Sequence, residues 1–225
     1  LKQDGFLPSL IITSPDAKSG RGMCLHASPV AIFAEKNNIP CLKPEKFTEL
    51  LSVFTSEKSG LVVRRKEKLK EVLYDLFIVV AYGKIIPSRY LEIPQYGFIN
   101  IHPSLLPKYR GPSPIQMAIM NGDKKTGVTI MKIDEKMDHG PILSSKPYCI
   151  LHTAYHTQAE QELAKLGAEL LIETLPKYIA GELKQKEQDH SKATFTKLLT
   201  REDGRIDWNK TAEEIYNRVR ALNSE

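Results

Sequence analysis

One run of residues puts two polar side chains at the end of a buried strand: Gly97-Phe98-Ile99-Asn100-Ile101-His102-Pro103-Ser104-Leu105-Leu106-Pro107. Alternation along the expected strand, residues 98–102, sends Asn100 and His102 to the same face. Pro103 has no backbone N–H to give to a strand ladder, so pairing should stop there. Ligands of open α/β sheets bind beyond the carboxyl ends of the strands. An amide and an imidazole at this position therefore indicate a candidate site.

A second strand candidate, residues 127–133, leads into a loop that carries two carboxylates. The loop contains Asp134 and Asp138 and ends at Gly140. An isolated Asn, His or Asp near a turn is more often a turn former or a surface group than a catalytic residue. If the two strands are neighbours, however, Asp138 can reach His102. Their joint spacing thus makes Asn100, His102 and Asp138 candidate catalytic residues.

Apolar strands separated by helical segments predict an α/β fold with a Rossmann-like, mostly parallel sheet and helices on both faces. The run 76–81 has the composition of a strand buried on both faces, as in a parallel sheet. Further strands are expected at 6–13 and 39–42, and one or two edge strands at 142–150.

Helix signals accompany these strands. Ser28 should cap a helix that begins at Pro29. Ser113 and Pro114 should begin another, with Gln116 placed for a capping box and Asn121-Gly122 as its stop. Residues 45–54 are also expected to be helical. So are residues 157–175, whose expected core positions are Leu163, Leu166, Leu170 and Ile172 or Leu171.

The remaining segments indicate how the chain is divided. Residues 14–27 read as a polar loop, and the charged run within 56–70 reads as a solvated helix face. The amino-acid composition becomes more polar after residue 182, which is typical of a linker. A helix is then expected over 211–222, with a capping box made by Thr211 and Glu214, and it indicates the start of a new structural unit.

Composition argues against an intrinsically disordered chain and against a membrane-spanning one. The chain has 225 residues, of which 41% are hydrophobic and 26% charged, and no apolar run approaches the length needed to span a membrane. A net charge of +5 permits a polyanionic partner without demonstrating one. Cys24, Cys41 and Cys149 lack metal-like spacing and read as reduced thiols of a cytoplasmic protein, although an organellar one stays open.

The pattern from residue 100 to residue 140 resembles the signature of the folate-dependent formyltransferases. It comprises Asn100-x-His102-x-Ser104-Leu105-Leu106-Pro107, Tyr109-Arg110-Gly111 and Asp138-x-Gly140. Other runs resemble the members of this family that act on methionyl-tRNA. These runs are Ala81-Tyr82-Gly83-Lys84-Ile85-Ile86-Pro87, Gly20-Arg21-Gly22 before Ser28-Pro29-Val30, Pro114-Ile115-Gln116, Thr126-Gly127-Val128-Thr129 and Ile206-Asp207-Trp208.

The resemblance implies a domain organisation. Residues 1–182 would form the catalytic domain, 183–205 a linker, and 206–225 the start of a C-terminal, OB-like β-barrel domain. Family members carry a strand and a Gly-Thr-Pro turn upstream of the segment that opens this chain at Leu1. The resemblance therefore leads us to expect a chain without its first strand and without most of its C-terminal domain.

The resemblance also implies the reaction, which is transfer of a formyl group from 10-formyltetrahydrofolate to the amino group of methionyl-initiator tRNA, for translation initiation. His102 would move protons, Asn100 would stabilise the developing oxyanion, and Asp138 would orient and polarise His102 directly or through a water. No nucleophilic Ser or Cys is required, since Ser104 lacks a separate base and should cap its own loop. We expect a monomer that uses no metal.

Folate and tRNA contacts follow from the resemblance alone. The tRNA acceptor end is expected to meet Arg21 and Lys18, since a guanidinium binds phosphate bidentately and stacks on bases. Folate is expected between the turn after the 76–81 strand and the loop that ends at Gly140. Its expected contacts are Ala81, Tyr82, Gly83, Ile86, Ser104, Leu105, Leu106, Pro107, Asp134 and Gly140.

Other readings share the three polar residues. Sugar N-formyltransferases and glycinamide ribonucleotide transformylase use the same chemistry on other acceptors, and formyltetrahydrofolate hydrolase uses water. A module that binds tRNA or folate without catalysis is the non-enzyme alternative. His156 also departs from the acidic residue that many family members have there, which puts local substrate contacts in question.

Overall fold

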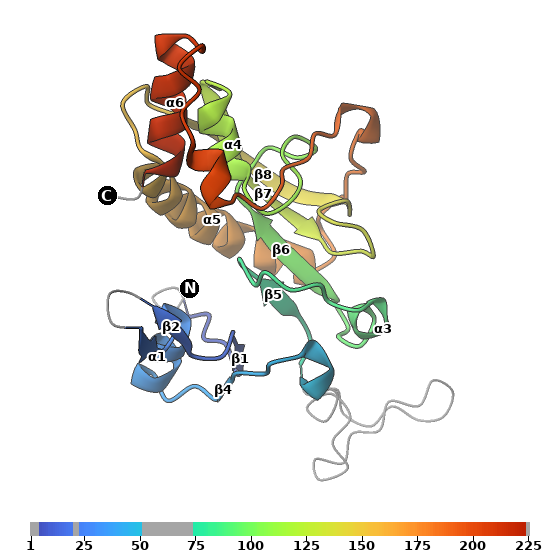
Figure 1. The fold of residues 1–225 in the computed structure, drawn as a ribbon. Coiled ribbons are helices and arrows are strands. Elements are labelled where there is room, and N and C mark those ends of the chain that lie inside the picture. The colour runs from blue at the N-terminus through green and yellow to red at the C-terminus, as the bar shows by residue number, and fades with distance from the viewer. Residues whose placement is uncertain (1–4, 20–22, 51–73, 224–225) are drawn as a thin grey trace, which may run out of the picture. The chain divides into compact units, whose positions relative to one another are not determined.

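The computed structural model describes residues 5–19, 23–50 and 74–223 (Figure 1). They belong to two compact units: unit 1 is Leu1–Asp75 with Tyr82–Gln95, and unit 2 is Leu76–Ala81 with Tyr96–Glu225. The charged run expected to be a solvated helix within 56–70 lies outside the described residues.

Unit 1 is built on two short parallel strands and a helix. Strand β1 (Ile11–Ile12) pairs with β4 (Cys41–Leu42), and α1 (Pro29–Lys36) packs against both. Both strands are shorter than expected. As predicted, the Ser28 hydroxyl accepts the Ala31 N–H at 3.1 Å and Pro29 opens the helix.

Two predictions in unit 1 need correction. The expected polar loop contains an antiparallel hairpin of β2 (Ala17–Ser19) and β3 (Cys24–His26). The helix expected over residues 45–54 is, in its described part, a 3₁₀ turn, η2 (Phe47–Leu50). A further short helix, α3 (Ser88–Leu91), also belongs to this unit.

Unit 2 is centred on a four-stranded sheet. Its order is β5-β6-β7-β8, formed by β5 (Phe77–Val79), β6 (Phe98–His102), β7 (Lys125–Lys132) and β8 (Ile142–Cys149). The α/β class is confirmed, but the pairing is more mixed than expected. Strands β5 and β6 are parallel, whereas β6–β7 and β7–β8 are antiparallel. The short loop between β7 and β8 makes them run antiparallel, because a parallel connection needs a longer crossover.

Strand β5 is shorter than the apolar run 76–81 that predicted it. Phe77 stacks on Phe98 at a centroid distance of 4.7 Å, but Ile78, on the alternate position, is 39% exposed. Within unit 2, β5 is the end strand of this sheet.

One face of the sheet is covered by α5 (His156–Ile179), which packs on β7 and β8 (Figure 1). Leu163, Leu170 and Leu171 are buried, so Leu171, and not Ile172, takes the core position that the sequence left open. Gly167 lets the helix approach the sheet, because an added Cβ would lie 2.9 Å from Cγ2 of Ile101. Since Ile101 faces α5, its neighbours along β6 face the opposite side.

Two further helices lie side by side next to α5 in Figure 1: α4 (Pro114–Met120) and α6 (Ala212–Leu222). Thr211 and Glu214 form the predicted capping box, in which the Thr211 hydroxyl accepts the Glu214 N–H at 3.2 Å. Ser113 occupies the predicted cap position of α4, but its hydroxyl makes no capping hydrogen bond. Between α5 and α6 the chain contains two 3₁₀ turns, η4 (His190–Lys192) and η5 (Arg201–Gly204). Within the described ranges, no helix is long and apolar enough to cross a membrane.

Candidate active site

The three predicted catalytic side chains converge in unit 2. Asn100 and His102 point from β6 away from α5, and Asp138 reaches them from the loop between β7 and β8. Nδ2 of Asn100 donates to Oδ1 of Asp138 at 3.4 Å, and Nδ1 of His102 lies 3.7 Å from Oδ2 of Asp138. The His102 side chain is 5% exposed and that of Asp138 15%. An amide donor, an imidazole and a carboxylate therefore share one largely enclosed site.

The other ring nitrogen of His102 has a fixed partner. Nε2 lies 2.9 Å from the carbonyl oxygen of Tyr109. A carbonyl oxygen only accepts, so Nε2 carries a hydrogen. In the neutral ring the lone pair is then on Nδ1, which is the nitrogen that faces Asp138.

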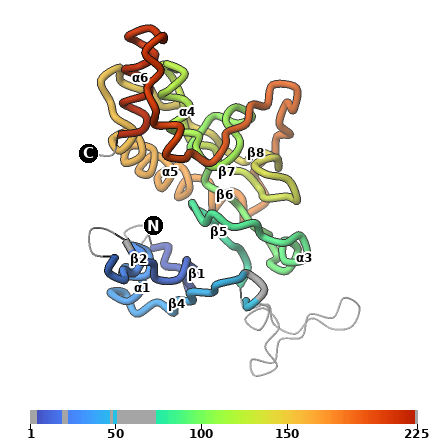
Figure 2. The backbone as a smooth tube through the Cα atoms, in the orientation of Figure 1, coloured from blue at the N-terminus to red at the C-terminus, as the bar shows by residue number. Residues whose placement is uncertain are grey.

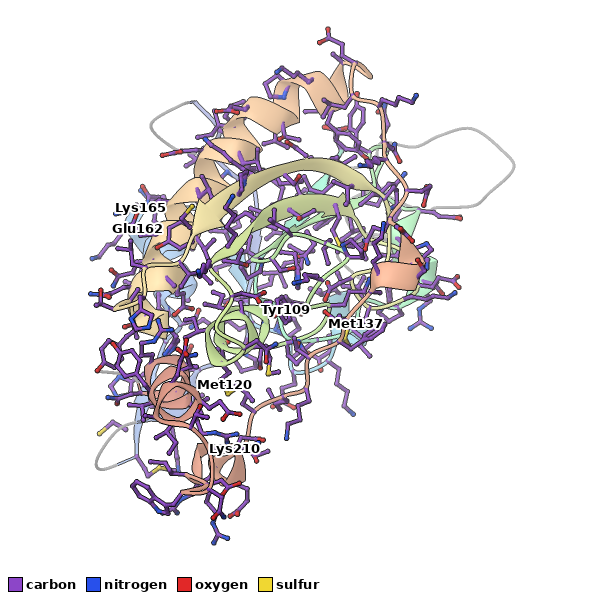
Figure 3. All side chains as sticks on the ribbon, turned by 90° about the horizontal axis from the view of Figure 1, so that it is seen from above. Tyr109, Met120, Met137, Glu162, Lys165 and Lys210 are labelled. Atoms are coloured by element: carbon purple, nitrogen blue, oxygen red, sulfur yellow. The ribbon has the colours of Figure 1, made fainter. Side chains whose placement is uncertain are left out.

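Tyr109 is anchored at three points, and it lies on the loop after β6 (labelled in Figure 3). Its backbone has a φ of 60°, its N–H donates to Oγ1 of Thr194 at 2.8 Å, and its hydroxyl donates to Oδ2 of Asp123 at 2.8 Å. The hydroxyl also accepts from Nδ2 of Asn121 at 3.0 Å. Burial raises the pKa of the Tyr109 hydroxyl; the Asn121 bond lowers this pKa and Asp123 raises it. These anchors hold the carbonyl oxygen that binds His102.

Asp138 sits in a constrained loop. Its φ is 47°, a left-handed conformation that is uncommon for a residue with a side chain. Its Oδ2 accepts the backbone N–H of Gly111 at 2.7 Å, and its carbonyl oxygen accepts from Nε2 of Gln188 at 3.0 Å. Two residues on, an added Cβ at Gly140 would overlap the carbonyl oxygen of Lys132. The loop therefore needs glycine at position 140 for close backbone approach.

Arg110 is a buried cation beside this loop, 3% exposed. Its Nε and one terminal nitrogen donate to Oε1 of Gln188 at 3.2 and 2.7 Å, and that terminal nitrogen also donates to Nδ1 of His190 at 2.9 Å. Burial lowers the pKa of Arg110, and the charges of Asp134 and Asp138 oppose that shift. A neutral amide, and not a carboxylate, is thus the main hydrogen-bond acceptor for this guanidinium.

Two stacked histidines, His139 and His190, lie at the end of the hydrogen-bond network that contains Arg110. Nδ1 of His139 lies 2.6 Å from Oδ2 of Asp134, and the His139 ring stacks on His190 with centroids 4.1 Å apart. The Asp134–Gly140 loop is therefore joined to the segment around residue 190. Among the described residues, no three His, Cys, Asp or Glu side chains gather as metal ligands would.

The segment 188–196 lies along both loops of the site. Figure 2 traces this orange part of the chain between α5 and α6. The Arg110 N–H donates to the Thr194 carbonyl at 2.9 Å, and the Thr196 N–H donates to the Arg110 carbonyl at 2.7 Å. Oγ1 of Thr196 accepts the Ser113 N–H at 3.1 Å. Part of the predicted linker is thus built into the site.

The predicted folate residues lie in several places. Ser104 is fully buried and its hydroxyl donates to the Lys108 carbonyl at 2.6 Å, as expected for a residue that closes its own loop. Leu106 is also buried, and Leu105 and Pro107 flank it in the same loop. Ala81, Asp134 and Gly140 belong to unit 2, whereas Tyr82, Gly83 and Ile86 belong to unit 1. The folate contacts therefore stay predictions.

One of the two predicted tRNA residues is described by the structure. Lys18 is on β2. Arg21 lies outside the described residues. Their roles also stay predictions.

Sequence reasoning missed Gln188 and the roles of the Tyr109 carbonyl and the Gly111 N–H. Tyr109-Arg110-Gly111 was visible as part of the gapped pattern, but the contacts made by backbone atoms have no sequence signal. Gln188 stands between Glu187 and Asp189 in a polar run, so nothing in its sequence surroundings sets it apart.

The fold and the site agree with one class of protein. The family model for formyl transferase matches residues 7–175, and that for the formyl transferase C-terminal domain matches residues 198–225. The chain belongs to the formyl transferase family. Its relatives are named more narrowly, as methionyl-tRNA formyltransferase. That of Roseiflexus sp. (strain RS-1) is 44% identical over 94% of this chain and 61% of the relative. That of Thermotoga maritima is 40% identical over 100% of this chain and 67% of the relative.

Solved structures agree on the fold. An N-formyltransferase from Helicobacter canadensis, in complex with folinic acid and dTDP-3-aminofucose, gives a TM-score of 0.67 at 18% identity, over 96% of this chain and 81% of that one. A 4-N formyltransferase from Francisella tularensis gives 0.69 at 19% identity, over 95% and 88%. The chain spans between about 61% and 67% of the length of the curated relatives it matches.

Proposed function

We propose that this chain carries the catalytic unit of an enzyme that moves a formyl group from 10-formyltetrahydrofolate to the amino group of methionyl-tRNA. The observation that carries the proposal is the convergence of Asn100, His102 and Asp138 in a member of the formyl transferase family. The names of the relatives that are 40–44% identical support methionyl-tRNA as the acceptor.

The reaction is acyl transfer to an amine, and it needs a base, an oxyanion stabiliser and an acid. The uncharged amine attacks the formyl carbon, the formyl oxygen gains negative charge, and the bond from carbon to the folate nitrogen breaks. That nitrogen then takes up a proton. His102 would remove the proton from the amine and return one to the folate nitrogen, a function that imidazole performs near neutral pH.

The bond to Tyr109 supports one atom of His102, Nδ1, as the site of these proton transfers. Because Nε2–H is donated to the Tyr109 carbonyl, Nδ1 holds the lone pair that would accept the proton. Once protonated, Nδ1–H faces Oδ2 of Asp138, and a small movement of either side chain would shorten the 3.7 Å separation to a hydrogen bond. Asp138 would thus stabilise the imidazolium that forms, without itself taking the proton.

Asn100 would stabilise the oxyanion. Its amide nitrogen carries two hydrogens, and one of them is directed at Oδ1 of Asp138. The second can be donated to the formyl oxygen as charge develops there. Asn100→Ala should then lower the rate by about 10²–10³-fold, as removal of one oxyanion donor typically does.

Folate and tRNA complete the proposal. We place the pterin of the donor against the turn at Ala81-Tyr82-Gly83 and the Asp134–Gly140 loop, because such loops bind ligands in α/β folds. Arg21 and Lys18 would contact the tRNA phosphates, since glycines flank Arg21 in a basic segment.

The test uses the complete protein with 10-formyltetrahydrofolate and three acceptors: methionyl-tRNA, an amino-sugar nucleotide and glycinamide ribonucleotide. We expect methionyl-tRNA to be formylated fastest, and His102→Ala to lower that rate by about 10²–10⁴-fold with the fold intact. Faster formylation of either small acceptor would overturn the assignment of the acceptor. A His102→Ala variant as active as the parent would overturn the mechanism.

The role of Arg21 is tested through salt dependence. Arg21→Ala should raise the KM for methionyl-tRNA and flatten its dependence on salt, with folate binding unchanged, because fewer counterions are released. Lys36→Ala, which changes an exposed residue in the last turn of α1, is the matched control. Equal salt slopes for the parent, Arg21→Ala and Lys36→Ala would remove Arg21 from the proposal.

A further inference from the structure

Gln188 is buried at the point where the predicted linker meets the site. It is 5% exposed, although its neighbours Glu187 and Asp189 are exposed. Its Oε1 accepts two hydrogen bonds from Arg110, and its Nε2 donates to the carbonyl oxygens of Asp138 at 3.0 Å and Gly140 at 2.8 Å. A glutamine amide has two acceptor sites and two donor hydrogens, so its capacity is fully used.

The orientation of this amide is determined by its partners. Arg110 can only donate, and the two backbone carbonyls can only accept. A glutamate at position 188 would keep the first interaction and lose the second. A methionine would keep the approximate shape and lose both. The two substitutions therefore separate the bonds to Arg110 from the bonds to the loop.

The loop that Gln188 holds is one that would not keep its shape unaided. Asp138 has a φ of 47°, and conformations of this kind cost about 1–3 kcal/mol unless the surroundings impose them. The Gly111 N–H fixes the carboxylate of Asp138, and Gln188 fixes its backbone. Together these contacts determine how far Oδ2 of Asp138 lies from Nδ1 of His102.

We infer that Gln188 is a positioning residue for the proposed formyl transfer: it fixes the backbone of Asp138 and Gly140 so that the Asp138 carboxylate stays beside His102. The inference rests on the proposed function, and Gln188 would act indirectly, because its hydrogen bonds go to Arg110, Asp138 and Gly140. Arg110 serves as the buried support that orients the amide.

The kinetic test compares Gln188→Met, Gln188→Glu and, as a matched control on the exposed neighbour, Glu187→Gln. We expect Gln188→Met and Gln188→Glu to lower kcat by about 10–100-fold, by analogy with the loss of a residue that orients a metal ligand, and Glu187→Gln to leave kcat unchanged. Gln188→Glu should stay folded, because it retains an acceptor for Arg110. If Gln188→Met does not fold, Gln188→Glu decides the matter. A Gln188→Glu enzyme as fast as the parent would overturn the inference.

A double-mutant cycle with Asp138→Asn separates positioning from general stability. If Gln188 acts through Asp138, Gln188→Met should cost less than about 3-fold in the Asp138→Asn background, because coupled residues are not additive. A residue that merely stabilises the fold would give the same loss in both backgrounds. Equal losses would therefore overturn the inference.

A measurement without turnover keeps this inference distinct from the proposed function. The Gly111 N–H, which is bound to Asp138, should exchange with deuterium faster in Gln188→Met than in the parent or in Glu187→Gln. An inactive parent would overturn the proposed function, while the exchange experiment would still report on the loop. Unchanged exchange in a folded Gln188→Met variant would overturn the positioning role.

Discussion

Nε2 of His102, at the end of β6, lies 2.9 Å from the carbonyl oxygen of Tyr109, in the loop that follows this strand. The carbonyl cannot donate, so this contact keeps the hydrogen of the neutral ring on Nε2 and the lone pair on Nδ1. In the proposed reaction, a backbone atom thereby determines which nitrogen of the imidazole would accept the proton. Tyr109 owes that position to its own anchors on Thr194 and Asp123.

The first prediction concerns this tautomer. In protein labelled with ¹⁵N at histidine, the His102 ring at alkaline pH should give a protonated Nε2 and an unprotonated Nδ1. His152, an exposed histidine beside Tyr216, serves as the reference ring in the same spectrum. A ring of His102 protonated on Nδ1 under these conditions would contradict both the hydrogen bond to Tyr109 and the assignment of the base.

The second prediction concerns Gly140. Gly140→Ala should destabilise the fold by at least about 1–3 kcal/mol and slow catalysis, because the new methyl group overlaps the backbone carbonyl of Lys132 and must move the loop that carries Asp138. Gly204→Ala is the matched control, since an added Cβ there meets nothing within 4 Å. Chemical denaturation and initial rates measure the two effects. Similar values for the two variants would show that the loop is not closely packed.

The third prediction concerns the alkaline limb of stability. The pKa of Tyr109 is raised mainly by burial, so the folded protein retains this proton at pH values where the unfolded chain has begun to lose it. The corresponding stabilisation is fully present below the ordinary tyrosine pKa of about 10 and is lost as the pH rises through the raised value. The parent should therefore lose more stability above pH about 10 than Tyr109→Phe does.

Other tyrosines titrate equally in both proteins, so the difference between the two curves belongs to Tyr109. At neutral pH, Tyr109→Phe should be less stable than the parent by about 1 kcal/mol, because the hydrogen bonds with Asp123 and Asn121 are lost. Parallel alkaline limbs in urea unfolding would contradict the predicted sign.

The fourth prediction uses two helix starts that look alike in sequence. Thr211→Ala should destabilise α6 by about 1 kcal/mol, because Thr211 exchanges hydrogen bonds with Glu214. Ser113→Ala should cost less at α4, because the Ser113 hydroxyl makes no capping bond. Far-UV circular dichroism during urea unfolding measures both. A larger loss for Ser113→Ala would reverse the ranking.

The central strand and the candidate catalytic residues were predictable because several independent signals coincide there. Alternation placed Asn100 and His102 on one face, Pro103 ended the strand, and the second strand brought in Asp138. The hairpin of β2 and β3 was not predictable in the same way. Its strands have three residues each and are largely exposed, so they lack the apolar alternation that marks a strand.

Capping was only partly predictable for a related reason. Ser28 and Thr211 cap as their sequences indicate, because their hydroxyls accept the N–H of the residue three positions on while they also contact Thr13 and the Glu214 carboxylate, respectively. At Ser113 the backbone N–H is instead bound by Thr196, from a segment more than eighty residues further along the chain. Such a tertiary contact overrides a local signal, and no window of sequence around Ser113 contains it. Gln188 escaped prediction for the same reason.

The segment 188–196 changes where this protein can be divided. A chimaera that joins residues 1–182 of this chain to another protein would retain Asn100, His102 and Asp138. It would lose the hydrogen bonds that Gln188, Thr194 and Thr196 make with Tyr109 and Arg110. The change in amino-acid composition after residue 182 therefore does not coincide with the end of the structural unit that contains the candidate site. An engineered module that keeps this site would therefore need the segment through Thr196, which supplies the hydrogen-bond partners of Tyr109 and Arg110.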